Sequence, residues 1–103
     1  GFIVKVAGKT IYFAGDTALF GDMQLLGQLE KIDYALLPIG DNFTMGPNDA
    51  TIACKLLAAT HVIPIHYNTW PLINQDPSLF KQQVEKLGYA QVLIVNPGEK
   101  ITL

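Results

Sequence analysis

The chain has 103 residues, and its 7 basic side chains against 9 acidic ones give a net charge of −2 at pH 7. This length fits one small domain or part of one and excludes two domains, and the slightly acidic balance excludes a basic nucleic-acid surface. Charged residues make up 16% of the chain and apolar residues 50%, whereas about 25% charged is typical of soluble domains. We therefore expect an apolar surface that a partner subunit or a further stretch of the same polypeptide covers.

Nothing in the sequence predicts a membrane segment, because polar residues, Pro or Gly interrupt every apolar run before the roughly 18 residues that a span requires. No signal peptide is visible, and the single Cys54 has no partner for an internal disulfide. These features favour a cytoplasmic protein without a membrane partner. The chain enters an apolar run directly after Gly1, so we expect it to be one part of a longer polypeptide.

The first half of the chain predicts a hairpin, a helix and a buried strand. Residues 2–7 and 10–14 are β-branched and aromatic runs joined by Gly8-Lys9, which is typical of a hairpin with a short turn. Asp22 is placed to cap a helix, and the continuously apolar run at 33–39 predicts a strand buried on both faces. The expected core stripe of the helix consists of Leu25, Leu26, Leu29 and Ile32.

The second half predicts two further helices alternating with strands. Gly46-Pro47 opens a helix with proline at its first position, and Asp76-Pro77 opens another that Gly88 ends. Strands are expected at 61–65, where Pro64 argues against full pairing, and at 91–95 and 100–103. The expected core residues are Ile52, Ala53, Leu56 and Leu57 of the first helix and Phe80, Val84 and Leu87 of the second. The order ββαβαβαββ predicts an α/β fold with a mixed sheet.

Polar residues follow directly on the carboxyl ends of three predicted strands, which is where ligands bind in α/β sheets. Asp16 follows an apolar strand and Gly15, so its carboxylate is a candidate metal ligand able to bridge two ions, or an ordinary turn aspartate. His66 ends the 61–65 strand and is a candidate metal ligand or general base, or a histidine with local hydrogen bonds. Asp41 and Asn42 follow the third strand as ligands, as acceptors beside the site, or as turn residues.

Other candidates and motifs are weaker. His61 begins a strand at the opposite edge and is expected at the surface, and Cys54 lies on the apolar side of a helix, where a buried inert thiol is the ordinary outcome. The sequence contains no G-x-G-x-x-G, no Walker loop and no G-x-S-x-G elbow, which argues against nucleotide binding and serine hydrolase chemistry. A catalytic zinc site usually takes three protein ligands, so Asp16 and His66 alone make an incomplete site.

Three segments, IYFAGDT (11–17), LPIGDNFTMGP (37–47) and VIPIHYNT (62–69), resemble the C-terminal half of the metallo-β-lactamase superfamily. More narrowly, they are similar to its branch of small metal-dependent hydrolases related to the ascorbate-6-phosphate lactonases. The resemblance covers nearly the whole chain and implies an αββα sandwich of two similar halves, with residues 1–103 as a single partial domain. It also implies that the missing N-terminal half carries the H-x-H-x-D-H motif, which this chain lacks.

The resemblance implies a site with two divalent ions, zinc or manganese, at the shared edge of the sheets. Asp16 matches the bridging aspartate and His66 the last histidine ligand, so both are implied in metal binding and catalysis. The residues implied to face substrate are Asp41, Asn42, Thr44, Met45, Tyr67, Asn68 and Thr69.

The leading functional hypothesis is the C-terminal part of a metal-dependent hydrolase, in which a metal-bound hydroxide attacks a small-molecule ester, lactone or phosphoester. The chain alone is expected to be inactive, to pair with the N-terminal half of the same domain, and to form homo-oligomers through an uncovered sheet face. The alternative is a non-catalytic half-domain that serves pairing or assembly. A receiver-like phospho-acceptor module is a third possibility, but the opening hairpin and the missing acidic pair argue against it.

Overall fold

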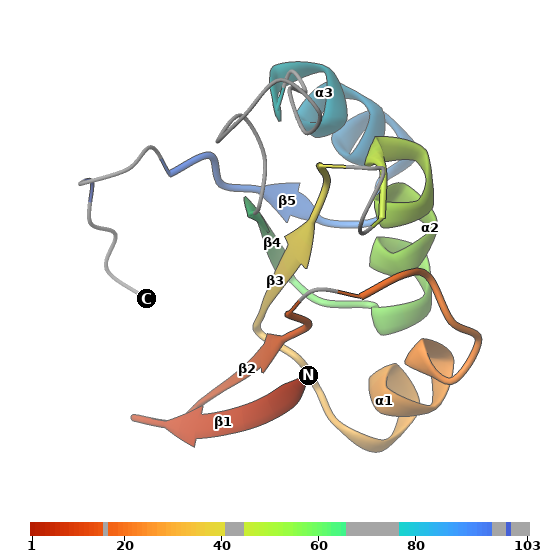
Figure 1. Cartoon of the computed structure of the whole chain (residues 1–103). Helices are drawn as coiled ribbons and strands as arrows, with labels where there is room; N and C mark the ends of the chain where they lie inside the picture. Colours follow the sequence, from red (N-terminus) through yellow and green to blue (C-terminus); the bar gives the residue numbers. More distant parts are fainter. Residues whose placement is uncertain (16, 41–44, 66–76, 96–98, 100–103) are drawn as a thin grey trace.

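The computed structural model describes residues 1–15, 17–40, 45–65, 77–95 and 99, and these form one sheet with three helices (Figure 1). The described elements follow the predicted order as far as β5, and the predicted strand at 100–103 lies outside the described residues. Within the described part of the chain, no helix has both the length and the apolar character needed to cross a membrane. The strands are β1 (Phe2–Val6), β2 (Lys9–Phe13), β3 (Tyr34–Pro38), β4 (His61–Ile65) and β5 (Gln91–Val92), and the helices are α1 (Met23–Leu29), α2 (Pro47–Leu57) and α3 (Pro77–Leu87).

The sheet is mixed, with strand order β1-β2-β3-β4-β5. β1 and β2 form the predicted antiparallel hairpin, but its turn residues are Ala7 and Gly8, at φ values of 50° and 76°, and not the expected Gly8 and Lys9, because Lys9 already pairs with Val6. Positive φ at both central positions is the turn geometry that matches the twist of a hairpin. From β2 to β5 all neighbours are parallel, so the carboxyl ends of these strands lie at one edge of the sheet.

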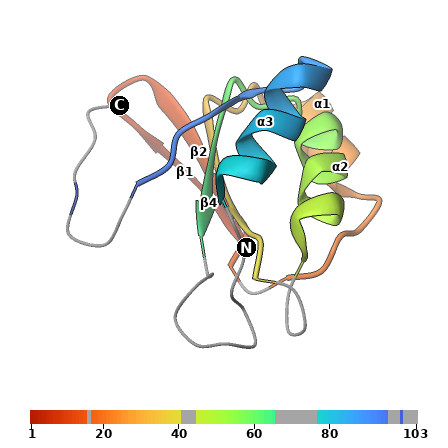
Figure 2. The same cartoon turned by 90° about the horizontal axis from the view of Figure 1, so that it is seen from above.

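All three helices lie on the same side of the sheet (Figure 2). The face that the helices cover can be followed along one row of paired residues, one from each strand, that crosses the described sheet. In this row Ala35, Val62 and Val92 are fully buried, because each strand presents every second side chain to the helices. The full row consists of Ile3, Tyr12, Ala35, Val62 and Val92.

Pro64 explains why β5 is shorter than the predicted 91–95. The amides of Gln91 and Leu93 donate to the carbonyls of Thr60 and Val62, at 3.1 and 2.9 Å. The next β4 residue that faces β5 is Pro64, which has no N–H to donate, so the ladder ends there. On its other side, β4 pairs with β3 along its full length. The expectation that Pro64 prevents full pairing is therefore confirmed on the β5 side.

All three predicted helix faces are wrong in part, that of α3 at Leu87 alone. Leu25 and Leu29 of α1 are exposed, the latter at 79%, whereas Met23 and Ile32 are buried. The reason is Gly27: a Cβ at this position would lie 2.5 Å from the Leu56 carbonyl oxygen and 2.6 Å from that of Leu57. Close contact between α1 and the end of α2 thus selects the glycine face, not the leucine-rich one.

The buried face of α2 likewise consists mostly of small residues and not of the large ones that were predicted. Ile52 is exposed, and the buried face consists of Ala50, Thr51, Ala53, Cys54 and Leu57. Pro47 occupies the first turn after Gly46 as predicted.

The predicted start of α2 at Gly46-Pro47 and the predicted end of α3 at Gly88 are observed, whereas the predicted cap of α1 by Asp22 is not. Asp22 precedes α1 but forms no side-chain cap bond. In α3, Phe80 and Val84 are buried and Leu87 is exposed, while Gly88, at φ 73°, follows the helix as predicted. Asp76 lies outside the described residues.

The sheet face opposite the helices is apolar, and no described helix covers it (Figure 2). We call it the open face and define it by the cross-strand neighbours Phe2, Val4, Ile11, Phe13 and Leu36. Phe2 and Phe13 stack here with ring centroids 5.5 Å apart, yet Phe2 and Val4 remain 60% and 41% exposed. This is the apolar surface that the sparse charge of the sequence predicts.

Replacing Gly27 with alanine is expected to lower the free energy of unfolding by about 1–3 kcal/mol, since the added methyl group meets two backbone carbonyls that cannot rotate away. This clash outweighs the roughly 1 kcal/mol that alanine gains over glycine in a helix. Urea unfolding followed by circular dichroism measures the difference. Gly21→Ala is the matched control, because nothing lies within 4 Å of its added Cβ; equal midpoints for the two variants would contradict the close helix contact.

The open face is expected to drive self-association of the chain. Sedimentation velocity at micromolar to millimolar concentration should show species larger than a monomer, and the double variant Phe2→Thr, Val4→Thr should require an about tenfold higher concentration, since it removes apolar area worth about 1.4 kcal/mol or more. Leu29→Gln changes a still more exposed apolar residue on the helical side and serves as the control. A clean monomer of the unchanged chain at all concentrations would overturn the expectation.

Candidate functional site

The candidate site is the edge of the sheet where β2, β3 and β4 end. These parallel strands finish at Phe13, Pro38 and Ile65, and the chain leaves all three in the same direction. Asp16, Asp41 and His66 each follow one of these ends within three residues. At this edge, β2, β3 and β4 are therefore each followed in sequence by a candidate polar residue.

Three backbone hydrogen bonds tie the chain together at this edge. The Ala14 amide donates to the Leu36 carbonyl at 3.1 Å, and the Ile39 amide donates to the Ile65 carbonyl at 3.1 Å. Further out, the Met45 amide donates to the Thr17 carbonyl at 3.0 Å. The last bond holds the end of the 41–44 segment against the residue that follows Asp16.

The side chains predicted for the site lie outside the described residues, with one exception. Met45 is described, and its side chain is 1% exposed and belongs to the hydrophobic core. It was expected to face substrate, but here it anchors the end of the loop in the core. The predicted residues outside the described part are Asp16, Asp41, Asn42, Thr44, His66, Tyr67, Asn68 and Thr69.

The two weaker candidates, His61 and Cys54, lie away from this edge. His61 is the first residue of β4, at the opposite end of the strand, and its ring stacks on Tyr34 with centroids 5.1 Å apart. Cys54 is fully buried in the core face of α2. Burial raises the pKa of the Cys54 thiol to about 12, so the thiol stays protonated near neutral pH and is a poor nucleophile. The prediction of an inert buried cysteine is confirmed.

Asp33 is a positioning residue that the sequence reading missed. Its amide donates to the Thr10 carbonyl at 2.9 Å, and its carboxylate accepts from the Thr10 amide at 2.8 Å. Its carbonyl accepts from the His61 amide at 3.0 Å. One residue therefore aligns the starts of β2, β3 and β4. An aspartate directly before an apolar strand was the available signal.

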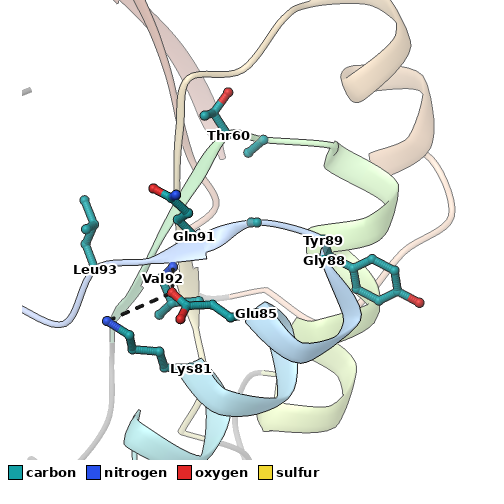
Figure 3. Close-up of a pocket in the computed structure, with 10 residues that line it drawn as sticks. Thr60, Lys81, Glu85, Gly88, Tyr89, Gln91, Val92 and Leu93 are labelled. Atoms are coloured by element: carbon teal, nitrogen blue, oxygen red, sulfur yellow. Dashed lines mark hydrogen bonds and ion pairs between the residues drawn. The ribbon is translucent and has the colours of Figure 1, made fainter.

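The described residues contain no group of three or more His, Cys, Asp or Glu side chains able to hold a metal ion. Their clearest pocket, of about 720 Å³, lies elsewhere, beside α3 and β5 (Figure 3). It is lined by Thr60, Gln91 and their neighbours at the amino ends of β4 and β5, so it is separate from the candidate edge.

Comparison with known proteins identifies the family. Residues 1–67 match the beta-lactamase superfamily domain. The chain belongs to the β-lactamase superfamily. The superfamily resemblance seen in the sequence is thus confirmed, whereas the narrower likeness to ascorbate-6-phosphate lactonases has no specific support in these matches.

Curated relatives of this superfamily member are named metal-dependent hydrolases. A UPF0173 metal-dependent hydrolase of Pelotomaculum thermopropionicum is 60% identical over 103 residues, which is 100% of this chain and 45% of that protein. One from Desulforamulus reducens is 64% identical over 99 residues, or 96% of this chain and 43% of that protein. The chain therefore spans about half the length of the relatives it matches.

Solved structures show the same fold. Igni18, described as a novel metallo hydrolase from the archaeon Ignicoccus hospitalis, matches with a TM-score of 0.86 and 48% identity over 91% of this chain and 41% of its own. A Thermotoga maritima protein of the metallo-β-lactamase superfamily matches at a TM-score of 0.64 and 19% identity, covering 89% of this chain and 55% of its own, which supports the fold alone. The predicted metallo-β-lactamase-like α/β fold is confirmed.

Proposed function

We propose that residues 1–103 form the C-terminal part of a metal-dependent hydrolase domain that cleaves a small-molecule ester, lactone or phosphoester. The names of the relatives support hydrolysis and a metal. The resemblance to ascorbate-6-phosphate lactonases supports a lactone among the substrates. The chain spans 45% of its Pelotomaculum relative, so the proposal assigns the rest of the domain to an N-terminal half.

The observation that carries this proposal is the shared carboxyl edge of β2, β3 and β4. Backbone bonds of 3.0–3.1 Å join Thr17 to Met45 and Ile39 to Ile65, which are the residues that flank the candidate ligands. A carboxylate and an imidazole delivered to one edge suit a divalent ion of the zinc or manganese type. The donor chemistry of this edge therefore fits a metal site.

In this proposal Asp16 and His66 would hold the divalent ions, Asp16 as the carboxylate shared between two ions and His66 as a neutral imidazole ligand. Bound divalent ions would supply Lewis-acid activation of water and of the substrate. Asp16 and His66 would keep the ions at the edge where β2 and β4 end. Both residues are catalytic in the sense that they touch the reacting centre.

The residues beside these ligands are proposed to bind substrate. Asp41, Asn42 and Thr44 carry hydrogen-bonding groups in the stretch of sequence between β3 and the buried Met45. The segment 67–69 adds a phenol, an amide and a hydroxyl directly after His66. Such groups orient a polar small molecule against the metal edge. We also propose a cytoplasmic location, because the single Cys54 is free and has no partner for an internal disulfide.

A non-catalytic half-domain that serves pairing or assembly is the second candidate function. The open face favours it, because Phe2 and Val4 keep an apolar surface that needs a partner. In the hydrolase proposal the same face packs on the N-terminal half. The two functions differ in whether the full-length protein binds metal and turns over substrate.

Asp16→Asn in the full-length protein is expected to abolish metal retention and activity together, since an amide is a poor bridge between two cations. The loss should exceed the roughly 10- to 100-fold that removal of an outer hydrogen-bond partner costs. Metal content after dialysis and hydrolysis of lactone and phosphodiester substrates are the two readouts. Asp22→Asn is the control, because Asp22 is exposed and forms no cap bond; equal metal content and turnover in both variants would reject the role of Asp16.

The 103-residue chain alone is expected to bind zinc or manganese weakly and to hydrolyse nothing, whereas the full-length protein does both. Two protein ligands leave the remaining coordination positions to water, so the ion exchanges freely. The same dialysis and hydrolysis assays on both proteins test this. Stoichiometric metal and comparable turnover in the short chain would require a further ligand within it, with Asp41 the first to examine, because His61 lies at the far end of β4. A full-length protein without metal or turnover would favour the assembly function.

A further inference from the structure

The outer edge of β5 is the place where a further strand would extend the described sheet. β5 is last in the strand order and pairs on one side only among the described residues, with β4. An edge strand offers a row of outward backbone groups to which a strand of another chain can pair. What lies along this edge therefore decides whether the sheet can grow.

The outward amide of β5 is that of Val92. The amides of Gln91 and Leu93 donate inward to Thr60 and Val62 of the β4 segment. Because successive amides of a strand point in opposite directions, the Val92 amide between them points away from β4. Its partner is a side chain: the Glu85 carboxylate of α3 accepts from it at 3.0 Å.

Figure 3 shows the side chains of Glu85 and Lys81 lying beside Val92, along the wall of the 720 Å³ pocket. Lys81 approaches the same Glu85 carboxylate oxygen at 4.0 Å, from one turn earlier in α3. Both side chains are partly exposed, at 44% and 38%. A strand arriving at β5 would have to displace this ion pair and compete with a carboxylate for the Val92 amide.

We infer that Glu85, supported by Lys81, protects the outer edge of β5 in the described sheet and prevents the β5 edge of a second copy of this chain from pairing with it. Short edge strands, charged side chains and occupied edge amides are the means by which sheets avoid edge-to-edge association. All three meet here: β5 has two residues, the ion pair flanks it, and its outward amide is bonded. This surface is distinct from the open face, which lies on the broad side of the sheet.

The test is self-association of the Glu85→Ala chain against matched variants. It should form species larger than those of the unchanged chain at an about tenfold lower concentration, which corresponds to about 1.4 kcal/mol. In these species the Val92 amide should gain protection from hydrogen exchange as concentration rises. Glu85→Gln keeps an acceptor oxygen, and Lys81→Ala leaves the Glu85 bond in place, so both should need a higher concentration to associate than Glu85→Ala does.

Glu85→Met is the second variant, since methionine matches glutamate in length, favours a helix and carries no oxygen acceptor. It replaces Glu85→Ala if that variant does not fold, with the same expected result. The inference is overturned if a folded variant without the acceptor sediments like the unchanged chain, or if it associates without added protection at Val92. It is also overturned if Glu85→Gln associates as strongly as Glu85→Met.

Discussion

The alignment of three parallel strand starts by Asp33 is the constraint on which the rest of the structure depends. Asp33 bonds to Thr10 through both its amide and its carboxylate, and to the His61 amide through its carbonyl. β3 and β4 are level over their full lengths, from Tyr34 opposite His61 to Pro38 opposite Ile65, whereas β2 ends two residues earlier, with Phe13 opposite Leu36. Because the register of parallel strands is the same along their whole length, fixing it at Asp33 sets which residues come at the carboxyl edge. Contacts at the amino edge of the sheet thus determine which residues come at the candidate site on the carboxyl edge.

One-sided covering of the sheet is the second organising fact, and small residues make it possible. Ala35 of β3, Ala50 and Ala53 of α2 are fully buried, and Gly27 of α1 lets the Leu56 and Leu57 carbonyls approach without a clash. Close packing with these residues consumes little apolar side-chain area. Alternation along β1 and β2 places Phe2, Val4, Ile11 and Phe13 on the open face, where no described helix covers them.

The sequence predicted strand and helix positions better than helix faces, and the reason is physical. Some sequence signals act through the local backbone alone, such as the continuously apolar run at 33–39, the helix start at Gly46-Pro47 and the helix end at Gly88. For this reason β3, α2 and the end of α3 were predictable. The apolar periodicity of a helix is read from its large apolar residues, and glycine adds nothing to it. It therefore predicted that Leu25 and Leu29, and not the Gly27 side of α1, face the core. The length of β5 depended on Pro64 of a different strand, a non-local effect that no local pattern carries.

For the site, sequence reasoning could assign candidates to an edge but could not supply a complete ligand set. The chain has two histidines, and His61 begins the strand that Ile65 ends. Four steps of about 3.3 Å put the two ends of that strand about 13 Å apart, whereas zinc–nitrogen bonds are about 2 Å long. His61 and a ligand at the carboxyl edge therefore cannot share one ion. Cys54 is buried in α2 with its thiol protonated, so it adds no ligand either. Any further histidine at this edge must come from outside these 103 residues, and the open face provides the surface on which such a half-domain can pack.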